Sequence, residues 1–155
     1  MDMSELALEH IRGVVTSFRK GLILDRFSKF AKGEIFILNC LRQRGETALP
    51  SELSEKLGSS TARVATALGA LEKKGLITRE MDKTDRRKII VTITDAGNEL
   101  AYRENEQLMT WETRIFEKMG TKDAKEFIRL HKLYLELSEE VEAEKIEKSE
   151  KIEAK

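Results

Sequence analysis

Several features on which other protein classes depend are scarce in this sequence of 155 residues. Cys40 is the single cysteine, which excludes an internal disulfide framework and a zinc site built from cysteines. No apolar run approaches the roughly 20 residues that a membrane-spanning helix needs. The N-terminal stretch MDMSELALEH lacks the basic start and the apolar segment of a secretory signal. We therefore expect a cytoplasmic protein with no membrane partner.

Aromatic residues are also few, at 6%, whereas charged residues make up 36%, a balance that suits long and exposed helix faces. The formal net charge is +0, but the charge is unevenly distributed along the chain. From Ser59 to Thr92 eight Lys and Arg residues outnumber four Asp and Glu, a local net charge of +4. From Glu139 to Lys155 seven Glu outnumber four Lys, a local net charge of −3. A phosphate backbone responds to local charge, so the basic middle segment is a candidate for binding nucleic acid.

The spacing of apolar residues predicts helices on both sides of this basic segment. A first helix is expected from Ser4 to Leu22, because its apolar residues recur every three or four positions: Leu8, Ile11, Val15, Phe18 and Leu22. The period is lost from Asp25 to Lys32, and a second helix is expected from Gly33 to Arg44. Cys40, between Leu38 and Leu41, is interpreted as a buried small hydrophobe in preference to a redox sensor.

Two long helices are expected in the C-terminal third of the chain. Thr94 can cap the first, from Asp95 to Met119, and Gly120 ends it. The second begins at Thr121. The tail from Ser138 is dominated by Glu and Lys, so it either extends this helix into solvent or is disordered.

The middle of the chain has the sequence form of a helix-turn-helix. Pro50 suits the first position of a short helix that runs to Leu57, because its missing N–H has no partner there in any case. Gly58 ends this helix, and a longer one is expected from Ser60 to Lys74. Two short helices joined by a tight turn that contains glycine are typical of this motif. A short extended segment, Thr47 to Leu49, precedes it.

After Gly75 the apolar period changes from about four to two, which predicts a β-hairpin. The strands are expected at Leu76 to Glu80 and at Lys88 to Ile93, where β-branched residues are frequent. The charged connection from Met81 to Arg87 is too long for a two-residue turn and is expected to protrude.

The longer helix of the motif has the two faces that a recognition helix needs. Its apolar stripe would pack on its own domain and consists of Val64, Leu68 and Leu71. The residues turned away from it would enter the major groove and are Ala62, Arg63, Thr66 and Ala70. Arg63 is the candidate base reader, with a plain phosphate or surface contact as the alternative. Ser60 and Thr61 could bind a phosphate at the helix start, and Gly69 indicates close approach to a neighbouring helix or to DNA.

The hairpin tip carries four further cations, Lys83, Arg86, Arg87 and Lys88. An Arg on a narrow projection suits a narrow minor groove, where the negative potential is strongest. Asp85 lies two residues before Arg87, on the same side of an extended chain, and can hold its guanidinium in a bidentate pair. The alternative is an exposed ion pair that contributes little.

Four segments together resemble the MarR family of transcriptional regulators. They are Leu53–Gly58, Leu71–Arg79, Asp82–Arg87 and Thr92–Gly97, in the order and with the gaps of that family. The resemblance implies a homodimer of triangular outline, with the first and the last two helices at the dimer interface. It also implies that the helix from Ser60 to Ala70 enters the major groove and that Arg87, paired with Asp85, enters the minor groove.

The chain departs from the family pattern at Thr66, a position that often holds a basic residue, and Arg63 lies one turn earlier. This departure moves the expected base contact to Arg63. A symmetric dimer predicts a pseudo-palindromic operator with half-sites one helical turn, about 34–36 Å, apart. The family also makes a small aromatic effector conceivable, in a cleft formed by Phe18, Phe30, Phe36 and Trp111, although aromatics at helical spacing are more often core residues.

These observations predict a mainly helical fold with a small β-hairpin wing. Its expected parts are an N-terminal dimerisation helix (1–30), a winged helix-turn-helix (31–97), C-terminal dimerisation helices (98–138) and a charged tail (139–155). The expected function is a double-stranded DNA-binding regulator, a dimeric repressor relieved by an effector. The alternative is a protein-interaction module. An enzyme is not expected, because no nucleophile with its base, phosphate-binding loop or cofactor site is recognised. His10 and His131 are far apart in sequence, so no metal site is expected either.

Overall fold

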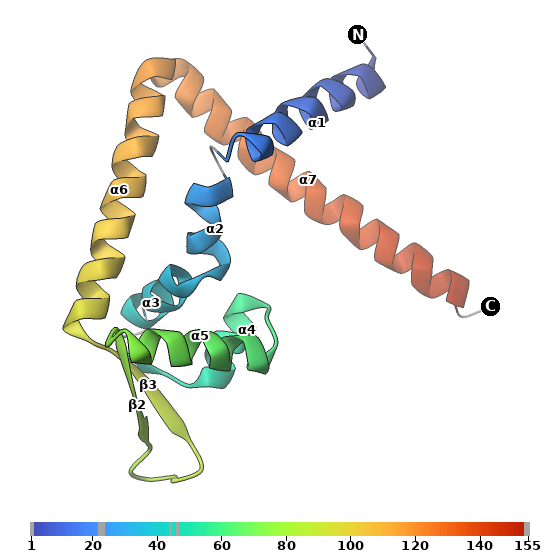
Figure 1. Cartoon of the computed structure of the whole chain (residues 1–155). Coiled ribbons are helices and arrows are strands. Elements are labelled where there is room, and N and C mark those ends of the chain that lie inside the picture. Colours follow the sequence, from blue (N-terminus) through green and yellow to red (C-terminus); the bar gives the residue numbers. More distant parts are fainter. Residues whose placement is uncertain (1, 22–23, 44, 46, 154–155) are drawn as a thin grey trace. The chain divides into compact units, whose positions relative to one another are not determined.

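The computed structural model describes the backbone of residues 2–21, 24–43, 45 and 47–153. The chain divides into two compact units, Met1–Leu108 and Met109–Lys155. Helices and strands follow the chain in this order (Figure 1): α1 (Met3–Arg19), α2 (Leu24–Lys32), α3 (Glu34–Gln43), β1 (Thr47–Ala48), α4 (Pro50–Leu57), α5 (Thr61–Lys73), β2 (Ile77–Met81), β3 (Ile89–Ile93), α6 (Asp95–Met119) and α7 (Thr121–Glu153). No described helix is long and apolar enough to cross a membrane.

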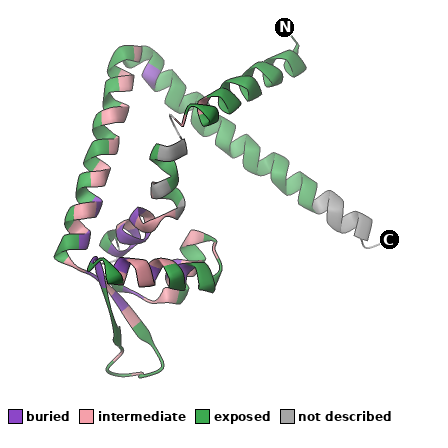
Figure 2. Cartoon of the chain, viewed as in Figure 1, coloured by how far each residue is buried: buried purple, intermediate pink, exposed green. Residues whose placement is uncertain are grey.

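The core of the first unit lies where α3, α4 and α5 meet the base of the hairpin (Figure 2). Each helix contributes the apolar side chains that share one face, and the largest fully buried ones are Ile37, Leu38, Leu41, Leu53, Val64, Leu68, Leu71, Ile77 and Val91. Burying a side chain of this size stabilises the fold by roughly 1.5–3 kcal/mol. The buried stripe predicted for α5 is confirmed, and so is the burial of Cys40.

The helix boundaries follow from local chemistry in the middle of the chain. Pro50 is the first residue of α4, as expected. Gly58 ends α4 in the left-handed conformation, with φ at 54°, which a residue with a Cβ adopts at a cost. The hydroxyl of Ser60 accepts a hydrogen bond from the Arg63 backbone N–H and so caps α5.

The three strands form an antiparallel sheet in the order β1-β3-β2. Thr47 lies opposite Thr92, so the short extended segment before the helix-turn-helix is a third strand that completes the sheet. In the hairpin Ile77 lies opposite Ile93, and Met81 lies opposite Ile89. The predicted mainly helical fold with a hairpin wing is confirmed.

Gly97 fixes the first turn of α6 against the base of the hairpin. A Cβ at this position would lie 2.1 Å from the Leu76 carbonyl oxygen and 2.8 Å from Cγ1 of Ile93. The hydroxyl of Thr94 caps the helix by accepting a hydrogen bond from the Gly97 N–H at 3.1 Å, and it donates one to the Gly75 carbonyl at 2.7 Å. A glycine is therefore required where α6 begins.

Helix α2 covers the segment from Asp25 to Lys32, where the apolar period of the sequence is lost and no helix was assigned. Its nine residues are shorter than the window in which helical periodicity is recognised, and contact with α3 supports it. The first helix ends at Arg19, and Leu22 lies outside the described residues. The charged tail is the extension of α7, which continues to Glu153.

In the second unit the chain turns between α6 and α7 at Gly120, with φ at 80°. The rings of Phe116 and Phe127 pack edge to face across this turn, with centroids 6.3 Å apart. Beyond this turn α7 leaves a run of apolar side chains exposed: Phe127, Ile128, Leu130, Leu133, Tyr134, Leu135, Leu137, Val141 and Ile146. In the first unit α1 has no buried residue.

Candidate nucleic-acid interface

Helix α5 turns its two faces in the directions that the sequence predicts. Val64, Leu68 and Leu71 are buried. Of the residues predicted to lie on the opposite face, Thr61, Ala62, Arg63 and Thr66 are exposed, whereas Ala70 is half-buried. Among the described residues no carboxylate forms an ion pair with Arg63, so its guanidinium can bind a base edge or a phosphate.

Two polar groups on this face already have partners within the helix. The Ser60 hydroxyl is the cap of α5, and the Thr66 hydroxyl donates a hydrogen bond to the Ala62 carbonyl at 3.0 Å. Thr66 therefore presents its methyl group and an acceptor oxygen, and not a free donor. Gly69 has no atom of the described structure within 4 Å of a Cβ built on it, so its predicted close approach to a neighbouring helix is wrong. The surface at Gly69 is open.

The wing turn is organised by Asp82, which the sequence analysis did not single out. Its carboxylate accepts hydrogen bonds from the Thr84 N–H at 2.6 Å, from the Asp85 N–H at 2.9 Å and from the Thr84 hydroxyl. These donors lower the pKa of Asp82 to about 2, the Thr84 hydroxyl most of all. An Asp side chain often accepts hydrogen bonds from the backbone N–H groups two and three residues further on in a turn. This position of Asp82 before Thr84 and Asp85 is the sequence signal that could have revealed its role in the wing turn.

The predicted pair between Asp85 and Arg87 is present. Nε of Arg87 lies 3.1 Å from Oδ1 of Asp85, and its Nη2 lies 3.5 Å from Oδ2. The Arg87 backbone N–H donates to the same carboxylate at 3.2 Å. The Arg87 side chain is 91% exposed, whereas that of Asp85 is 29% exposed. The carboxylate of Asp85 therefore orients the Arg87 guanidinium through one edge, and the other edges of the guanidinium are open to solvent.

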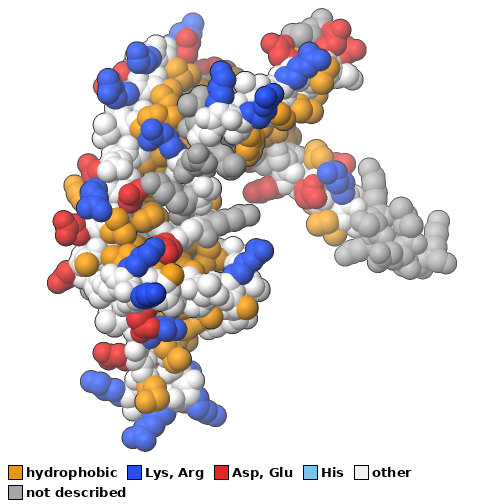
Figure 3. All heavy atoms as spheres, viewed as in Figure 1, with side chains coloured by type: hydrophobic (Ala, Val, Ile, Leu, Met, Phe, Trp, Pro, Cys, Tyr) orange, Lys and Arg blue, Asp and Glu red, His pale blue; other side chains and the backbone are white. Residues whose placement is uncertain are grey.

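The cations of the basic segment have two different roles. Lys74 binds Glu34 at 2.6 Å, and Arg79 binds Glu72 through its Nε at 2.9 Å, so both hold elements of the domain together. The pKa of Glu72 is lowered by its hydrogen bonds with Arg79. By contrast, no carboxylate of the described chain pairs with the side chains of Lys83 and Arg86. Lys and Arg side chains gather at the tip of the hairpin (Figure 3), as a surface that meets phosphates requires.

Two of the four aromatic residues predicted for an effector cleft come together. Phe30 and Phe36 line a pocket of about 520 Å³. The rest of its lining is Cys40 and the polar residues Asn39, Arg42, Gln43, Lys56 and Asn105. Phe18 is 51% exposed and is not part of this lining. Trp111 belongs to the second unit. The pocket thus combines an aromatic wall with polar groups, but from a different residue set.

The sequence and the fold match known proteins. The MarR family model matches residues 31–89. The chain is 28% identical over 95 residues to an uncharacterised HTH-type transcriptional regulator, YwhA of Bacillus subtilis (strain 168). The aligned region spans 61% of this chain and 68% of YwhA. This relative shares the class of function that the basic helix and wing suggest.

Solved structures share the fold at lower identity. FabT of Streptococcus pneumoniae, solved in complex with DNA, superposes with a TM-score of 0.64 at 22% identity. The superposition covers 85% of this chain and 98% of the FabT chain. The organohalide-sensing regulator RdhR-CbdbA1625, solved with bound 2,4-dichlorophenol, superposes with a TM-score of 0.63 at 16% identity. The superposition covers 90% of this chain and 82% of the RdhR chain. Residues 31–89 thus carry a MarR-type domain, and the chain is similar in sequence and fold to DNA-binding transcriptional regulators of the MarR family.

Proposed function

We propose that this protein represses transcription as a homodimer that binds a pseudo-palindromic operator. The observation that carries the proposal is the pair of outward surfaces on one winged-helix unit: the exposed face of α5 with Arg63, and the cationic wing with Arg87. A helix of this kind fits the major groove, and a narrow projection with an Arg fits the minor groove. A regulator of this kind would act in the cytoplasm.

The proposed DNA contacts divide into three groups. Base reading is assigned to Arg63, with Ala62 and Thr66 beside it on the exposed face. Phosphate binding is assigned to the start of α5, at Ser60 and Thr61, where free N–H groups and the helix dipole favour an anion. Minor-groove and backbone contacts are assigned to the wing, through Lys83, Arg86, Arg87 and Lys88, with Asp85 orienting Arg87.

Selection of bound sequences from random duplex DNA tests this proposal directly. We expect an enriched palindrome whose half-sites are about one helical turn apart. The Arg63→Ala, Arg87→Ala double variant should then lose affinity for the selected duplex at fixed salt. If the wild-type protein enriches no sequence, or if the double variant keeps full affinity, the proposal is wrong. The protein-interaction alternative is not favoured, and the family comprises regulators and not enzymes.

Residues 1–30 and 98–138 are proposed to form the dimer interface. The supporting observation is the apolar surface that both regions leave exposed, since exposed apolar patches of this kind mark interaction sites. Val15→Glu places a charge on the apolar stripe of α1, whereas Thr16→Glu places the same charge on its polar side. Light scattering after size-exclusion chromatography should show a dimer for the wild-type protein and the Thr16→Glu control, and a shift to monomer for Val15→Glu.

The pocket beside Phe30 and Phe36 is the proposed site for a small aromatic effector. Support comes from its aromatic wall and from the structural relative with bound 2,4-dichlorophenol. An effector acts only if it binds the two states of the dimer with different affinity. Titration with 2,4-dichlorophenol, followed by isothermal titration calorimetry and by release of the selected duplex, tests the site. Phe36→Ala should abolish both responses, and a response that Phe36→Ala leaves unchanged would exclude this pocket.

A further inference from the structure

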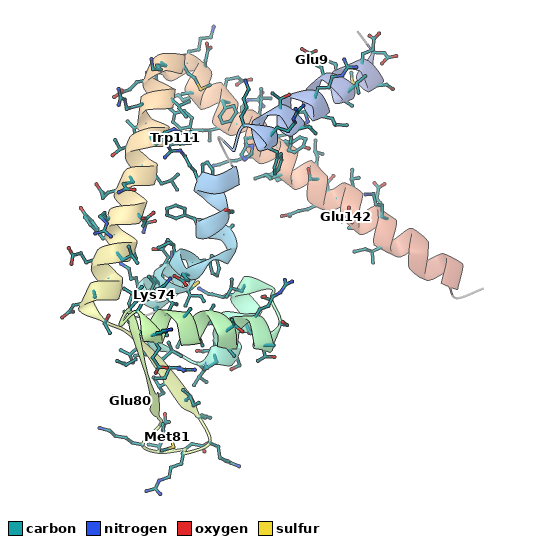
Figure 4. All side chains as sticks on the ribbon, viewed as in Figure 1. Glu9, Lys74, Glu80, Met81, Trp111 and Glu142 are labelled. Carbon is teal, nitrogen blue, oxygen red and sulfur yellow. The ribbon has the colours of Figure 1, made fainter. Side chains whose placement is uncertain are left out.

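Two large apolar side chains are exposed on the wing, next to its cations. Met81 is 68% exposed and Ile89 is 45% exposed. They lie directly opposite each other, at the last pair of the β2–β3 register before the turn. Directly opposed residues in an antiparallel pair project to the same face of the sheet, so the two side chains form one apolar surface. Figure 4 shows Met81 near the tip of the hairpin.

The register determines which face of the hairpin carries this surface. Side chains two residues apart along a strand share a face, so Met81 projects to the same side as Arg79 and Ile77. Ile77 is buried in the core, and Arg79 binds Glu72, a residue of α5. The Met81–Ile89 surface is therefore the continuation of the face that packs on α5, beyond the last residues that the helices cover. It faces the side on which the recognition helix lies.

The surroundings of this surface are strongly cationic. The turn that follows Met81 and precedes Ile89 contains Lys83, Arg86, Arg87 and Lys88. Its two carboxylates are both engaged locally: Asp82 binds the N–H groups of the turn, and Asp85 binds Arg87. The charge around the apolar pair thus favours a polyanion as its partner and disfavours an apolar protein surface.

We propose that Met81 and Ile89 pack against the deoxyribose edge of the minor groove when the wing binds DNA, as an apolar contact that complements the ion pairs of Arg87. This inference rests on the proposed DNA-binding function. Sugars expose C–H groups along the groove walls between the phosphates, and apolar side chains such as Ile and Met are used by other proteins that bind this groove. The contact removes water from the apolar pair without neutralising a phosphate.

The proposed contact has a measurable signature because it carries no charge. Affinity lost with an Arg or a Lys is accompanied by a smaller dependence on salt, since each phosphate contact contributes to the slope of log K against log salt. Affinity lost with Met81 and Ile89 should leave that slope unchanged. The wing would therefore have a component of binding that persists at salt concentrations at which its ion pairs are weak.

The test measures affinity for the duplex selected by the wild-type protein, at several salt concentrations. The Met81→Gln, Ile89→Thr variant keeps the length or the β-branch of each side chain but makes both polar. Ile90→Thr is the matched control, because it makes the same change one residue further on, on the opposite face of β3. Met81→Leu, Ile89→Val is the second control, because it keeps the surface apolar. Thermal unfolding of each variant reports whether the hairpin is intact.

We expect the polar double variant to bind about five- to tenfold more weakly, with an unchanged salt slope and an unchanged melting temperature. Ile90→Thr and the apolar double variant should bind as the wild-type protein does. Unchanged affinity of the polar variant would overturn the inference while the proposed function stands. A loss shared equally by Ile90→Thr would also overturn it, because the effect would then lie in the hairpin fold. A wild-type protein that binds no duplex would overturn the proposed function and this inference together.

Discussion

Asn39 and Asn105 bind each other through their side-chain amides and join α3 to α6. Nδ2 of Asn105 donates to Oδ1 of Asn39 at 2.7 Å, and Nδ2 of Asn39 donates back to Oδ1 of Asn105 at 3.3 Å. Asn105 also donates to the Ala101 carbonyl at 2.8 Å. Both residues line the pocket that contains Phe30 and Phe36. The pair is the polar link between the winged helix and the helix that leads towards the second unit.

The amide pair should show strong coupling in a double-mutant cycle. Asn39→Leu alone leaves the Asn105 amide half-buried without its partner and should lower the free energy of unfolding by about 1–2 kcal/mol. Asn39→Leu, Asn105→Leu removes both polar groups and should recover most of that loss. Urea unfolding at one fixed protein concentration measures all four proteins, because a dimer's stability depends on concentration. Additive losses would show that the two amides act independently.

Two glycines in helices should respond to alanine in opposite directions. Gly97→Ala places a Cβ on the Leu76 carbonyl and on Ile93, so it should lower the free energy of unfolding by at least about 1–3 kcal/mol. Gly69→Ala meets open space and should raise it by roughly 1 kcal/mol through helix propensity. Thermal and urea unfolding of both variants provide the measurement. Equal effects of the two substitutions would contradict the close packing at Gly97.

The wing turn should resist acid. The pKa of Asp82 is lowered from its ordinary value of 3.8 to about 2 by the hydrogen bonds of Thr84 and Asp85. Its contribution to turn stability is therefore fully present above pH 3.8 and is lost as the pH falls through about 2. A carboxyl ¹³C titration by NMR should show Asp82 titrating near 2, and Asp82→Ala should loosen the turn at neutral pH. Titration near the ordinary value would mean that the turn hydrogen bonds do not persist in solution.

Asp85→Asn should weaken DNA binding even though it removes a negative charge close to the phosphates. The expected reason is that the carboxylate orients the guanidinium of Arg87, which the pair holds at 3.1 Å. Glu80→Gln, on the same hairpin, removes a negative charge without removing that pair and should bind slightly more tightly. Arg87→Ala should reduce the salt slope by about 1. Tighter binding by Asp85→Asn would show that the pair is an incidental surface contact.

The sequence was sufficient for the parts of the fold that depend on local patterns. The stripe on α5, the αL glycine after α4 and the hairpin all follow from periodicity and turn chemistry. The pair of Asp85 and Arg87 was predicted from their spacing of two residues, although the structure places them in a turn that the Lys88 N–H closes on the Asp85 carbonyl and not in an extended segment.

Features that depend on tertiary contact could not be predicted in this way. Helix α2 is too short for its period to be read, and contact with α3 supports it. The partnership of Asn39 with Asn105 spans 66 residues and has no local signal. The pairing of Met81 with Ile89 was not predicted, because the sequence analysis assigned Met81 to the protruding connection and only the structure extends β2 to this residue.

The contact at Gly97 has a mechanical consequence for signalling. The first turn of α6 rests directly on the Leu76 carbonyl and on the Ile93 side chain, and Thr94 is tied to the Gly75 carbonyl, so the helix is close-packed on the base of the wing. A close-packed joint transmits displacement instead of absorbing it. We therefore expect a tilt of the N-terminal end of α6 to shift the base of the strand pair.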